Sequence, residues 1–289
     1  MTDTLAILNR AALLPDPPGS ARDVLASLPP RALIRTLPAQ AVPPFTPQGP
    51  TTRRAQALKL MAEAAFEQTS KGPATTLAFC TQYGEDDAPP TLPGLNSPQR
   101  SHRGGPSAGL QLFITAARQI SQGDHPRMLL TSSDVIDHDA TQALQRFYSD
   151  ASAPLPPLAE AATALWLGRA DDERLGPRVG VRTLIGAPCL THESLTAFLT
   201  PLVQPPGSFP VNVDRVISAT SAPERFESET HAIERLFPNT PLLHLAWTTG
   251  QAGASLGLLG IHAALEESGT TLLVATDTEA SAAVLLFTP

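Results

Sequence analysis

The sequence predicts a layered α/β protein. Apolar segments of strand length alternate along the chain with amphipathic segments of helical period, which is the pattern of sheets covered by helices. Composition supports this fold class, because 42% of the 289 residues are hydrophobic and 16% are charged, as in proteins with a sizeable packed core. Proline is concentrated in the first 50 residues, so we expect that region to be extended surface chain around short elements.

The first half contains the clearest helix signal of the chain. Pro106 stands at a favoured first helical position, one apolar face continues along the segment, and Gly123 ends it. A threonine start signal and a helical period also predict a helix at 52–69. The expected order is short elements at 4–8 and 32–37, a helix at 52–69, a strand at 74–81, a loop to 96, a helix at 106–122, a strand at 127–133 and a short helix at 139–149.

The second half repeats the alternation of strands and helices. A proline-rich break at 151–160 separates the halves, so we expect an N-terminal half at 1–153, with a proline-rich start at 1–50, and a C-terminal half at 154–289. Each half should form a small sheet with helices. The expected order is strands at 162–168 and 179–188, a helix at 192–202, a strand at 215–220, a helix at 226–237, a strand at 242–247, a glycine-rich helix at 253–269 and strands at 271–278 and 281–288.

Charge and cysteine content exclude several functions. The formal net charge is −7 and no basic cluster exceeds Arg53 and Arg54, so we expect no nucleic-acid partner. Cys80 and Cys189 lie far apart without a CxxC spacing or a histidine cluster, which argues against a disulfide scaffold or a metal site, and no motif indicates a cofactor. The start of the chain lacks signal-peptide features and no segment has the length of a membrane span, so we expect a cytoplasmic protein.

Three turns between a strand and a helix carry the candidate functional residues. The first, GGPSAGLQLF at 104–113, has the form of a nucleophile elbow, but Pro106 takes the exposed place and has no nucleophilic group. Ser107 is the nearest hydroxyl, and we interpret it as a helix cap. The other two are 215–230, where Glu229 lies early in a helix, and 244–260, which is rich in glycine; taken singly, both are typical of helix ends and close packing.

The order and spacing of these turns resemble the β-ketoacyl synthase branch of the thiolase superfamily. That family has the motifs CxSG, HGTSTPxxDxxE and KxxxGHxxGAxG, and the corresponding segments here are PSAG at 106–109, SATSAPERFESE at 218–229 and AWTTGQAGASLG at 246–257. Phe226 replaces a family aspartate and Ala254 a family glycine. The resemblance spans most of 50–289. The positions in register are Gly109, Thr220, Ser221, Pro223, Glu229, Gly250 and Gly257.

The resemblance implies a thiolase-like fold of two similar α/β halves in αβαβα layers, without the family's chemistry. Carried over by position, the nucleophilic cysteine is Pro106, the two catalytic histidines are Ser218 and Gln251, and the lysine is Ala246. Family members that lose the cysteine are chain-length factors, which pair with an active synthase. The first half looks most like synthase-like proteins of bacterial aryl polyene pathways. The residues expected to line a remaining tunnel or pocket are Ser107, Thr220, Gly250 and Gln251.

The resemblance therefore implies a noncatalytic chain-length-factor-like subunit, not an enzyme on its own. Its expected partners are an active β-ketoacyl synthase, as a heterodimer, and acyl carrier protein, in polyene, fatty-acid-type or polyketide biosynthesis. One alternative is an acyl-thioester hydrolase or acyltransferase that uses Ser107 or Ser218 with His102 or His244. Another is a homodimeric scaffold that binds acyl carrier protein, which the acidic net charge disfavours because carrier proteins are themselves acidic.

Overall fold

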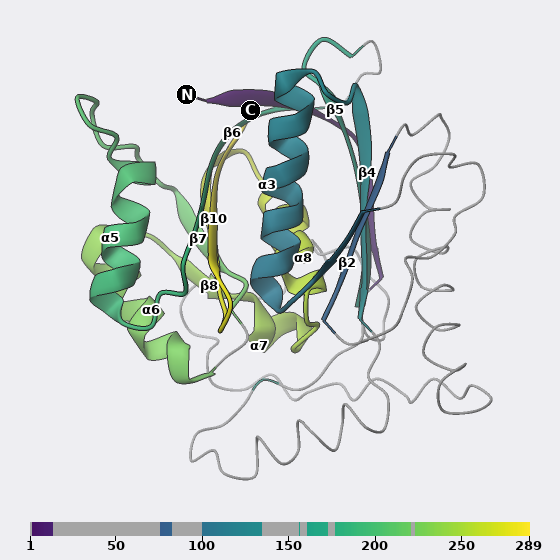
Figure 1. The fold of residues 1–289 in the computed structure, drawn as a ribbon. Helices are drawn as coiled ribbons and strands as arrows, with labels where there is room; N and C mark the ends of the chain where they lie inside the picture. The colour runs from purple at the N-terminus through teal and green to yellow at the C-terminus, as the bar shows by residue number, and fades with distance from the viewer. Residues whose placement is uncertain are drawn as a thin grey trace, which may run out of the picture.

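The computed structural model describes residues 2–13, 76–82, 100–134, 156, 161–172, 177–220 and 223–289. Its strands are β1 (Asp3–Leu13), β2 (Leu77–Thr81), β3 (Arg100–Arg103), β4 (Arg127–Asp134), β5 (Ala161–Arg169), β6 (Arg178–Gly186), β7 (Arg215–Ser218), β8 (Leu242–His244), β9 (Gly269–Thr276) and β10 (Ser281–Thr288). Its helices are α3 (Pro106–Gln122), α5 (His192–Val203), α6 (Pro223–Leu236), α7 (Leu245–Thr249) and α8 (Ser255–Ala264). Figure 1 shows how they are arranged.

The strands described form one sheet in the order β3-β2-β4-β5-β1-β6-β10-β9-β7-β8. Read inward from its two ends, this order repeats one plan. In the first half β2 runs parallel to β3 and β4, and β5 is antiparallel to β4 and β1. In the second half β7 runs parallel to β8 and β9, and β10 is antiparallel to β9 and β6. The prediction of two similar halves is therefore confirmed, and β1 joins them by pairing antiparallel with β6.

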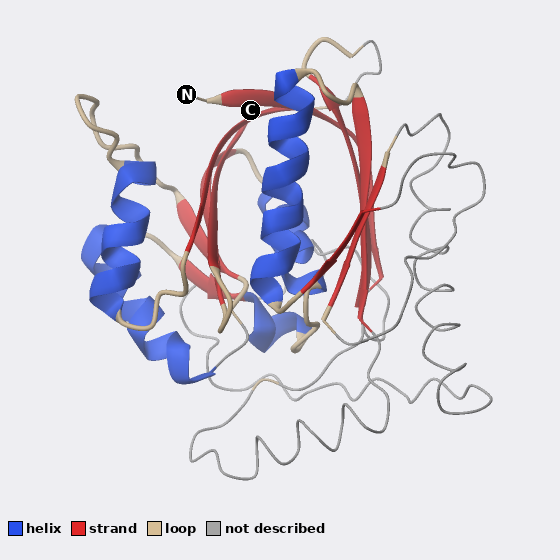
Figure 2. Cartoon of the chain, in the orientation of Figure 1, coloured by secondary structure: helices blue, strands red, loops and turns tan. Residues whose placement is uncertain are grey.

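The two halves of the sheet enclose a central layer of two helices. Helices α3 and α8 pack against each other between the halves, and α5 and α6 cover the outer face of the second half (Figure 2). Successive residues of β9 point to opposite faces of the sheet: Leu273 belongs to the core around α3 and α8, whereas Leu272 belongs to the core beneath α5 and α6. The described part of the chain thus shows four of the five expected layers.

The contact between α3 and α8 requires two glycines. A Cβ atom on Gly109 would overlap the carbonyl oxygen of Ala254, and one on Gly257 would lie 2.5 Å from the carbonyl oxygen of Pro106. The neighbouring atoms belong to backbone, which cannot move aside as a flexible side chain can. Glycine at both positions therefore lets the first turns of the two helices touch directly.

Two predicted elements differ from the structure. The apolar run at 242–247 was expected to be one strand, but β8 ends at His244 and α7 begins at Leu245, because a short apolar run does not by itself distinguish strand from helix. The helix expected at 253–269 covers only Ser255–Ala264. Gly253 has a φ of +52°, which is outside the right-handed helical region, and Gly269 already begins β9.

The remaining expectations agree with the structure where the structure describes them. The predicted helix at 106–122 is α3, and Gly123 ends it in the left-handed conformation. Strand β3 was not predicted. The elements expected at 32–37, 52–69 and 139–149 lie outside the described residues, as does the loop to 96. In the helices that are described, no segment is long and apolar enough to cross a membrane.

The division into halves at 153/154 remains a proposal about domains. In the sheet, β5 pairs with β4 and β1 and therefore lies with the strands of the first half. The repeat in strand order thus divides the chain between β5 and β6.

We expect Gly109→Ala or Gly257→Ala to lower the free energy of unfolding by at least about 3 kcal/mol, because the added methyl group meets backbone atoms. Urea denaturation measures this loss. Gly123→Ala is the matched control: no atom lies within 4 Å of its Cβ position, so only the strain of its left-handed conformation, about 1 to 2 kcal/mol, should appear. Equal losses in all three variants would contradict the close helix contact.

Candidate functional site

The predicted site residues lie together at the carboxyl ends of the parallel strands of the second half. Ser218 ends β7, and Ala246 lies buried in α7, directly after β8. Pro106 is the buried first residue of α3, whose first turn touches the first turn of α8. Carboxyl ends of parallel strands and N-termini of helices are where α/β proteins place their sites. The three motifs therefore meet in one region.

The first turn of α3 holds Pro106 where the resemblance places a cysteine. Proline fits this position because its fixed φ suits the first helical residue and its missing N–H would have no partner within the helix. The same property removes two groups from the site. Pro106 offers neither a nucleophilic side chain nor a backbone N–H that could donate to an oxyanion.

Ser107 is hydrogen-bonded to two neighbouring side chains, those of Asp277 and Gln111. Its hydroxyl donates to Oδ2 of Asp277, and its backbone N–H donates to the same oxygen at 3.2 Å. Gln111 donates from Nε2 to the Ser107 Oγ at 3.1 Å. Ser107 is therefore not the cap that the sequence suggested. It lies within the first turn of α3, and the cap is the carboxylate of Asp277, supplied from the turn between β9 and β10.

The turn that carries Asp277 is held from several directions. Its Oδ1 accepts hydrogen bonds from the backbone N–H groups of Glu279 and Ala280, both at 2.9 Å. Arg225, from the first turns of α6, donates from Nη1 to the backbone carbonyl of Asp277. The carboxylate thus has a fixed position over the N-terminus of α3, where the helix dipole favours negative charge.

The second central helix begins in the same way. Asp134, at the end of β4, accepts from the backbone N–H of Ser255 at 2.8 Å and from its hydroxyl at 2.9 Å. Strands β4 and β9 occupy equivalent places in the two halves, and Ser255 precedes Gly257 as Ser107 precedes Gly109. Burial raises the pKa of Asp134, although hydrogen bonds from Gln82, Ser255 and Thr81 oppose that effect. Each central helix is therefore capped by an aspartate of the opposite half.

Hydrogen bonds connect the second motif to the first. The Oγ of Ser218 accepts from the N–H of Thr220 at 3.3 Å. The Oγ1 of Thr220 accepts from the N–H of Thr276 at 3.0 Å and lies 3.2 Å from the Thr276 hydroxyl. Because Thr276 precedes Asp277, this chain of contacts leads from the end of β7 to the N-terminus of α3. Ser221 lies outside the described residues.

Glu229 lies buried on α6 beneath the second motif. Only 1% of its surface is exposed, and burial raises the pKa of its carboxyl from 4.5 to about 7. The nearby Ser218, Thr220 and Arg225 lower that pKa, but less than burial raises it. Among the described residues, neither carboxyl oxygen has a partner with hydrogen-bond geometry. The protonated form is thus favoured well above the pH at which a glutamate normally ionises.

The third motif lies beside the N-terminus of α8. Gly250 follows α7, and Gln251 is buried three residues before Ala254. A Cβ on Gly253 would lie 2.8 Å from the carboxyl carbon of Asp134, so this turn requires glycine both for space and for its positive φ. Ala254, which replaces a family glycine, has right-handed φ and ψ of −61° and −27°, a conformation that alanine adopts freely.

The structure places His244 opposite Ser218, because the two residues pair in register at the ends of the parallel strands β8 and β7. His244 is buried, which lowers its pKa to about 4, and its Nε2 lies 3.1 Å from the hydroxyl of Thr230. Phe226, at the position of a family aspartate, packs on its ring with centroids 4.9 Å apart. Within the described part of the chain, neither Ser107 nor Ser218 is hydrogen-bonded to a histidine. The side chain of His102 lies outside the described residues.

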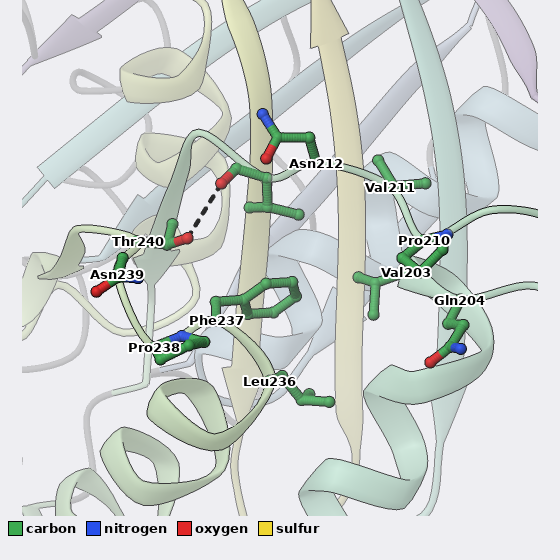
Figure 3. A pocket seen from close by; sticks show the side chains of 11 residues that line it. Val203, Gln204, Pro210, Val211, Asn212, Leu236, Phe237, Pro238, Asn239 and Thr240 are labelled. Carbon is green, nitrogen blue, oxygen red and sulfur yellow. Dashed lines mark hydrogen bonds between the residues drawn. The ribbon is translucent and has the colours of Figure 1, made fainter.

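A pocket of about 280 Å³ lies at the opposite edge of the second half (Figure 3). Asn212 and Val213 precede β7, and Thr240 precedes β8, where its hydroxyl donates to the Val213 carbonyl at 3.1 Å. The pocket therefore lies at the amino ends of these strands, whereas Ser218 lies at a carboxyl end. It is separate from the candidate site. Its other lining residues are Val203, Gln204, Pro210, Val211, Leu236, Phe237, Pro238 and Asn239.

The sequence analysis missed both aspartates that cap the central helices. The signal was present, because Asp134 ends β4 and Asp277 directly follows β9, so both lie at carboxyl ends of strands, where polar side chains meet the first turns of helices. It also missed Arg225, which fixes the turn containing Asp277.

We expect Glu229→Gln to stabilise the protein increasingly as pH rises. Folding raises the pKa of Glu229 from 4.5 to about 7, so the folded state binds the proton more tightly and the wild type loses stability across that interval. The difference between variant and wild type should grow by about 3 kcal/mol from pH 4.5 to pH 8. Urea denaturation at several pH values measures it.

Glu227→Gln, which alters an exposed carboxyl on the same helix, is the matched control for the lost charge. A stability difference for Glu229→Gln that stays constant from pH 4.5 to pH 8 would show that the buried carboxyl is not protonated at neutral pH.

Comparison with known proteins places this geometry in a known fold. No protein-family model matches the sequence, and no curated protein matches it. The structure is similar to the ishigamide ketosynthase/chain length factor, with a TM-score of 0.68 and 20% identity over 99% of this chain and 99% of that chain. It is also similar to cerulenin-bound OleA of Xanthomonas campestris, with a TM-score of 0.64 and 13% identity over 99% of this chain and 100% of that chain. The chain has the thiolase-like α/β fold that its motifs predicted.

Proposed function

We propose that this protein is a noncatalytic β-ketoacyl synthase-like subunit, of the chain-length-factor type, that pairs with an active synthase. The observation that carries the proposal is Pro106 at the first position of α3, where the matching motif has the nucleophilic cysteine. A thiolase-like fold with its central helices intact supports the motif alignment on which this correspondence rests.

The condensation reaction needs groups that this chain lacks. A cysteine accepts the acyl chain as a thioester, and two histidines stabilise the enolate formed when a malonyl thioester loses carbon dioxide. Proline cannot accept an acyl group, and the serine and glutamine at the histidine positions, Ser218 and Gln251, cannot supply equivalent donors. Ala246 takes the place of the lysine. With all four positions changed, we assign the chemistry to a partner.

The proposed partner is an active β-ketoacyl synthase that forms a heterodimer with this chain. A degenerate subunit keeps the fold that supports a shared interface while its own site decays. One similar structure is named as both a ketosynthase and a chain length factor, which agrees with such a pair. Substrates would arrive on acyl carrier protein and dock on the synthase, because carrier proteins are acidic and this chain has a net charge of −7.

The proposed complex makes a growing acyl chain, and this protein lines part of the path of that chain. We assign the complex to polyene, fatty-acid-type or polyketide synthesis in the cytoplasm, with aryl polyenes as the first candidate. The acyl chain would pass near Thr220, which follows β7, and near Gly250 and Gln251, which lie between α7 and α8. Ser107, the fourth residue expected there, lies in the first turn of α3 and is held by Asp277. Substitutions at these residues should change the length of the product while leaving the interface with the partner synthase intact.

A serine hydrolase or acyltransferase is the less favoured function. The serine mechanism pairs a serine with a histidine, and the Ser107 hydroxyl instead donates to Asp277 and accepts from Gln111. His244 lies opposite Ser218, but its Nε2 is 3.1 Å from the Thr230 hydroxyl, and burial lowers its pKa to about 4, which makes it a weak base. These contacts favour the noncatalytic function over a serine mechanism.

We expect the chain to co-purify with one β-ketoacyl synthase of its own organism. Tagged protein expressed in the native host, followed by mass spectrometry of the bound proteins, identifies that partner. The complex should persist through gel filtration as one heterodimer, since interfaces of this kind are large and apolar. A chain that remains a homodimer with every candidate synthase, together with normal polyene formation after its deletion, would contradict the proposal.

We also expect no covalent acyl adduct on the isolated protein after incubation with acyl thioesters. Intact-mass and peptide mass spectrometry should leave the peptide containing Ser107 unmodified, because Asp277 and Gln111 hold its hydroxyl and no histidine is hydrogen-bonded to it among the described residues. An active synthase treated in parallel, which acquires the acyl group on cysteine, shows that the thioesters are competent. An acyl group on Ser107 or Ser218 would instead establish the serine mechanism.

A further inference from the structure

We infer that Asp277 closes the N-terminus of α3 to acyl groups, independently of the loss of the cysteine. The inference rests on the proposed function, because only then does the first turn of α3 correspond to an acyl-binding position. It assigns a role to a residue of the turn between β9 and β10 that none of the three motifs contains.

Both carboxylate oxygens of Asp277 are engaged. Oδ2 accepts the Ser107 hydroxyl and, at 3.2 Å, the Ser107 backbone N–H, while Oδ1 accepts two backbone N–H groups of its own turn at 2.9 Å. A Cβ on Gly105 would lie 3.0 Å from Oδ2, so the carboxylate lies directly against the backbone before α3. The donors at this helix end are therefore already occupied.

The carboxylate of Asp277 at the N-terminus of α3 would repel the negative charge that develops during acyl transfer. The N-terminus of a helix stabilises one negative charge, whether a thiolate or the oxyanion of a tetrahedral intermediate. With Asp277 already there, a thiolate at position 106 would be a second negative charge beside the first, and like charges raise the pKa of a thiol. Restoring cysteine alone would thus give an unreactive thiol.

The symmetry of the fold supports this interpretation. Asp134 caps α8 through the N–H and hydroxyl of Ser255 in the same arrangement by which Asp277 caps α3 through Ser107. Asp134 is fully buried and Ser255 is fully buried, so that end of α8 has no access for a substrate. The end of α3 has the same hydrogen bonds, although Asp277 is half-buried rather than fully buried.

Thiol alkylation tests the inference directly. In a Cys80→Ala/Cys189→Ser background, Pro106→Cys places the only thiol at the first position of α3. Iodoacetamide reports thiolate, because the sulfur attacks the methylene carbon, iodide leaves with the bonding electrons and the thiol proton passes to buffer. Rates are measured from pH 6 to pH 10 for Pro106→Cys alone and with Asp277→Asn, Asp277→Ala, Glu279→Gln or Glu234→Gln. Circular dichroism establishes that each variant is folded.

Removing the Asp277 carboxylate should raise the alkylation rate at pH 7 by at least about tenfold and lower its pH midpoint by about one unit, since one pKa unit changes the thiolate fraction tenfold. Glu279 also faces this helix end, since its Oε2 lies 3.3 Å from a Cβ placed on Gly104, so Glu279→Gln should raise the rate less than the Asp277 variants do. Glu234→Gln, which removes an exposed carboxylate near the end of α6, is the matched control, and its rate should stay within about twofold of Pro106→Cys. Pro106→Cys alone should have a midpoint above about 8.5, the ordinary value for a thiol.

Equal rates with and without Asp277 would overturn the inference, as would a midpoint below that ordinary value in Pro106→Cys alone. If an Asp277 variant does not fold, a midpoint below about 8.5 in Pro106→Cys alone still overturns the inference. These rates do not depend on any partner, so a protein that binds no synthase but shows the Asp277 effect would contradict the proposed function and leave the closed helix end established.

Discussion

The direct backbone contact between α3 and α8 is the constraint on which the rest of the structure depends. Gly109 and Gly257 allow it, and any side chain at either position would meet carbonyl oxygens of the opposite helix. Two helices held this closely fix the positions of both first turns, and each half-sheet must then pack around the same central pair. The location of Pro106 follows from this contact before any chemistry is considered.

In the proposed noncatalytic function, the same contact lets the fold persist without a working site. Its core depends on apolar strands, paired glycines and the aspartates that cap each helix from the opposite half. A reactive nucleophile requires the opposite of a completed cap, namely helix N–H groups left free for a substrate oxygen. In this chain aspartates complete the first turns of both central helices, Asp277 at α3 and Asp134 at α8.

The sequence predicted those features whose signals are local. Helix 106–122 has its own start, apolar face and terminal glycine, and the spacing of three motifs predicted the fold and the position of Pro106. The contact between Ser107 and Asp277 joins residues 170 positions apart, and no local pattern specifies such a pair. The division of 242–247 between β8 and α7 was also missed, because tertiary packing rather than composition decides where so short a strand ends.

In the proposed function this chain supplies structure and a partner synthase supplies the chemistry. Reconstitution of product synthesis from the purified partner synthase, acyl carrier protein and thioester substrates, with and without this protein, measures that division most directly. The account predicts full-length product only when both chains are present, and its loss when the synthase cysteine is removed. Equal yield and chain length from the synthase alone would contradict it.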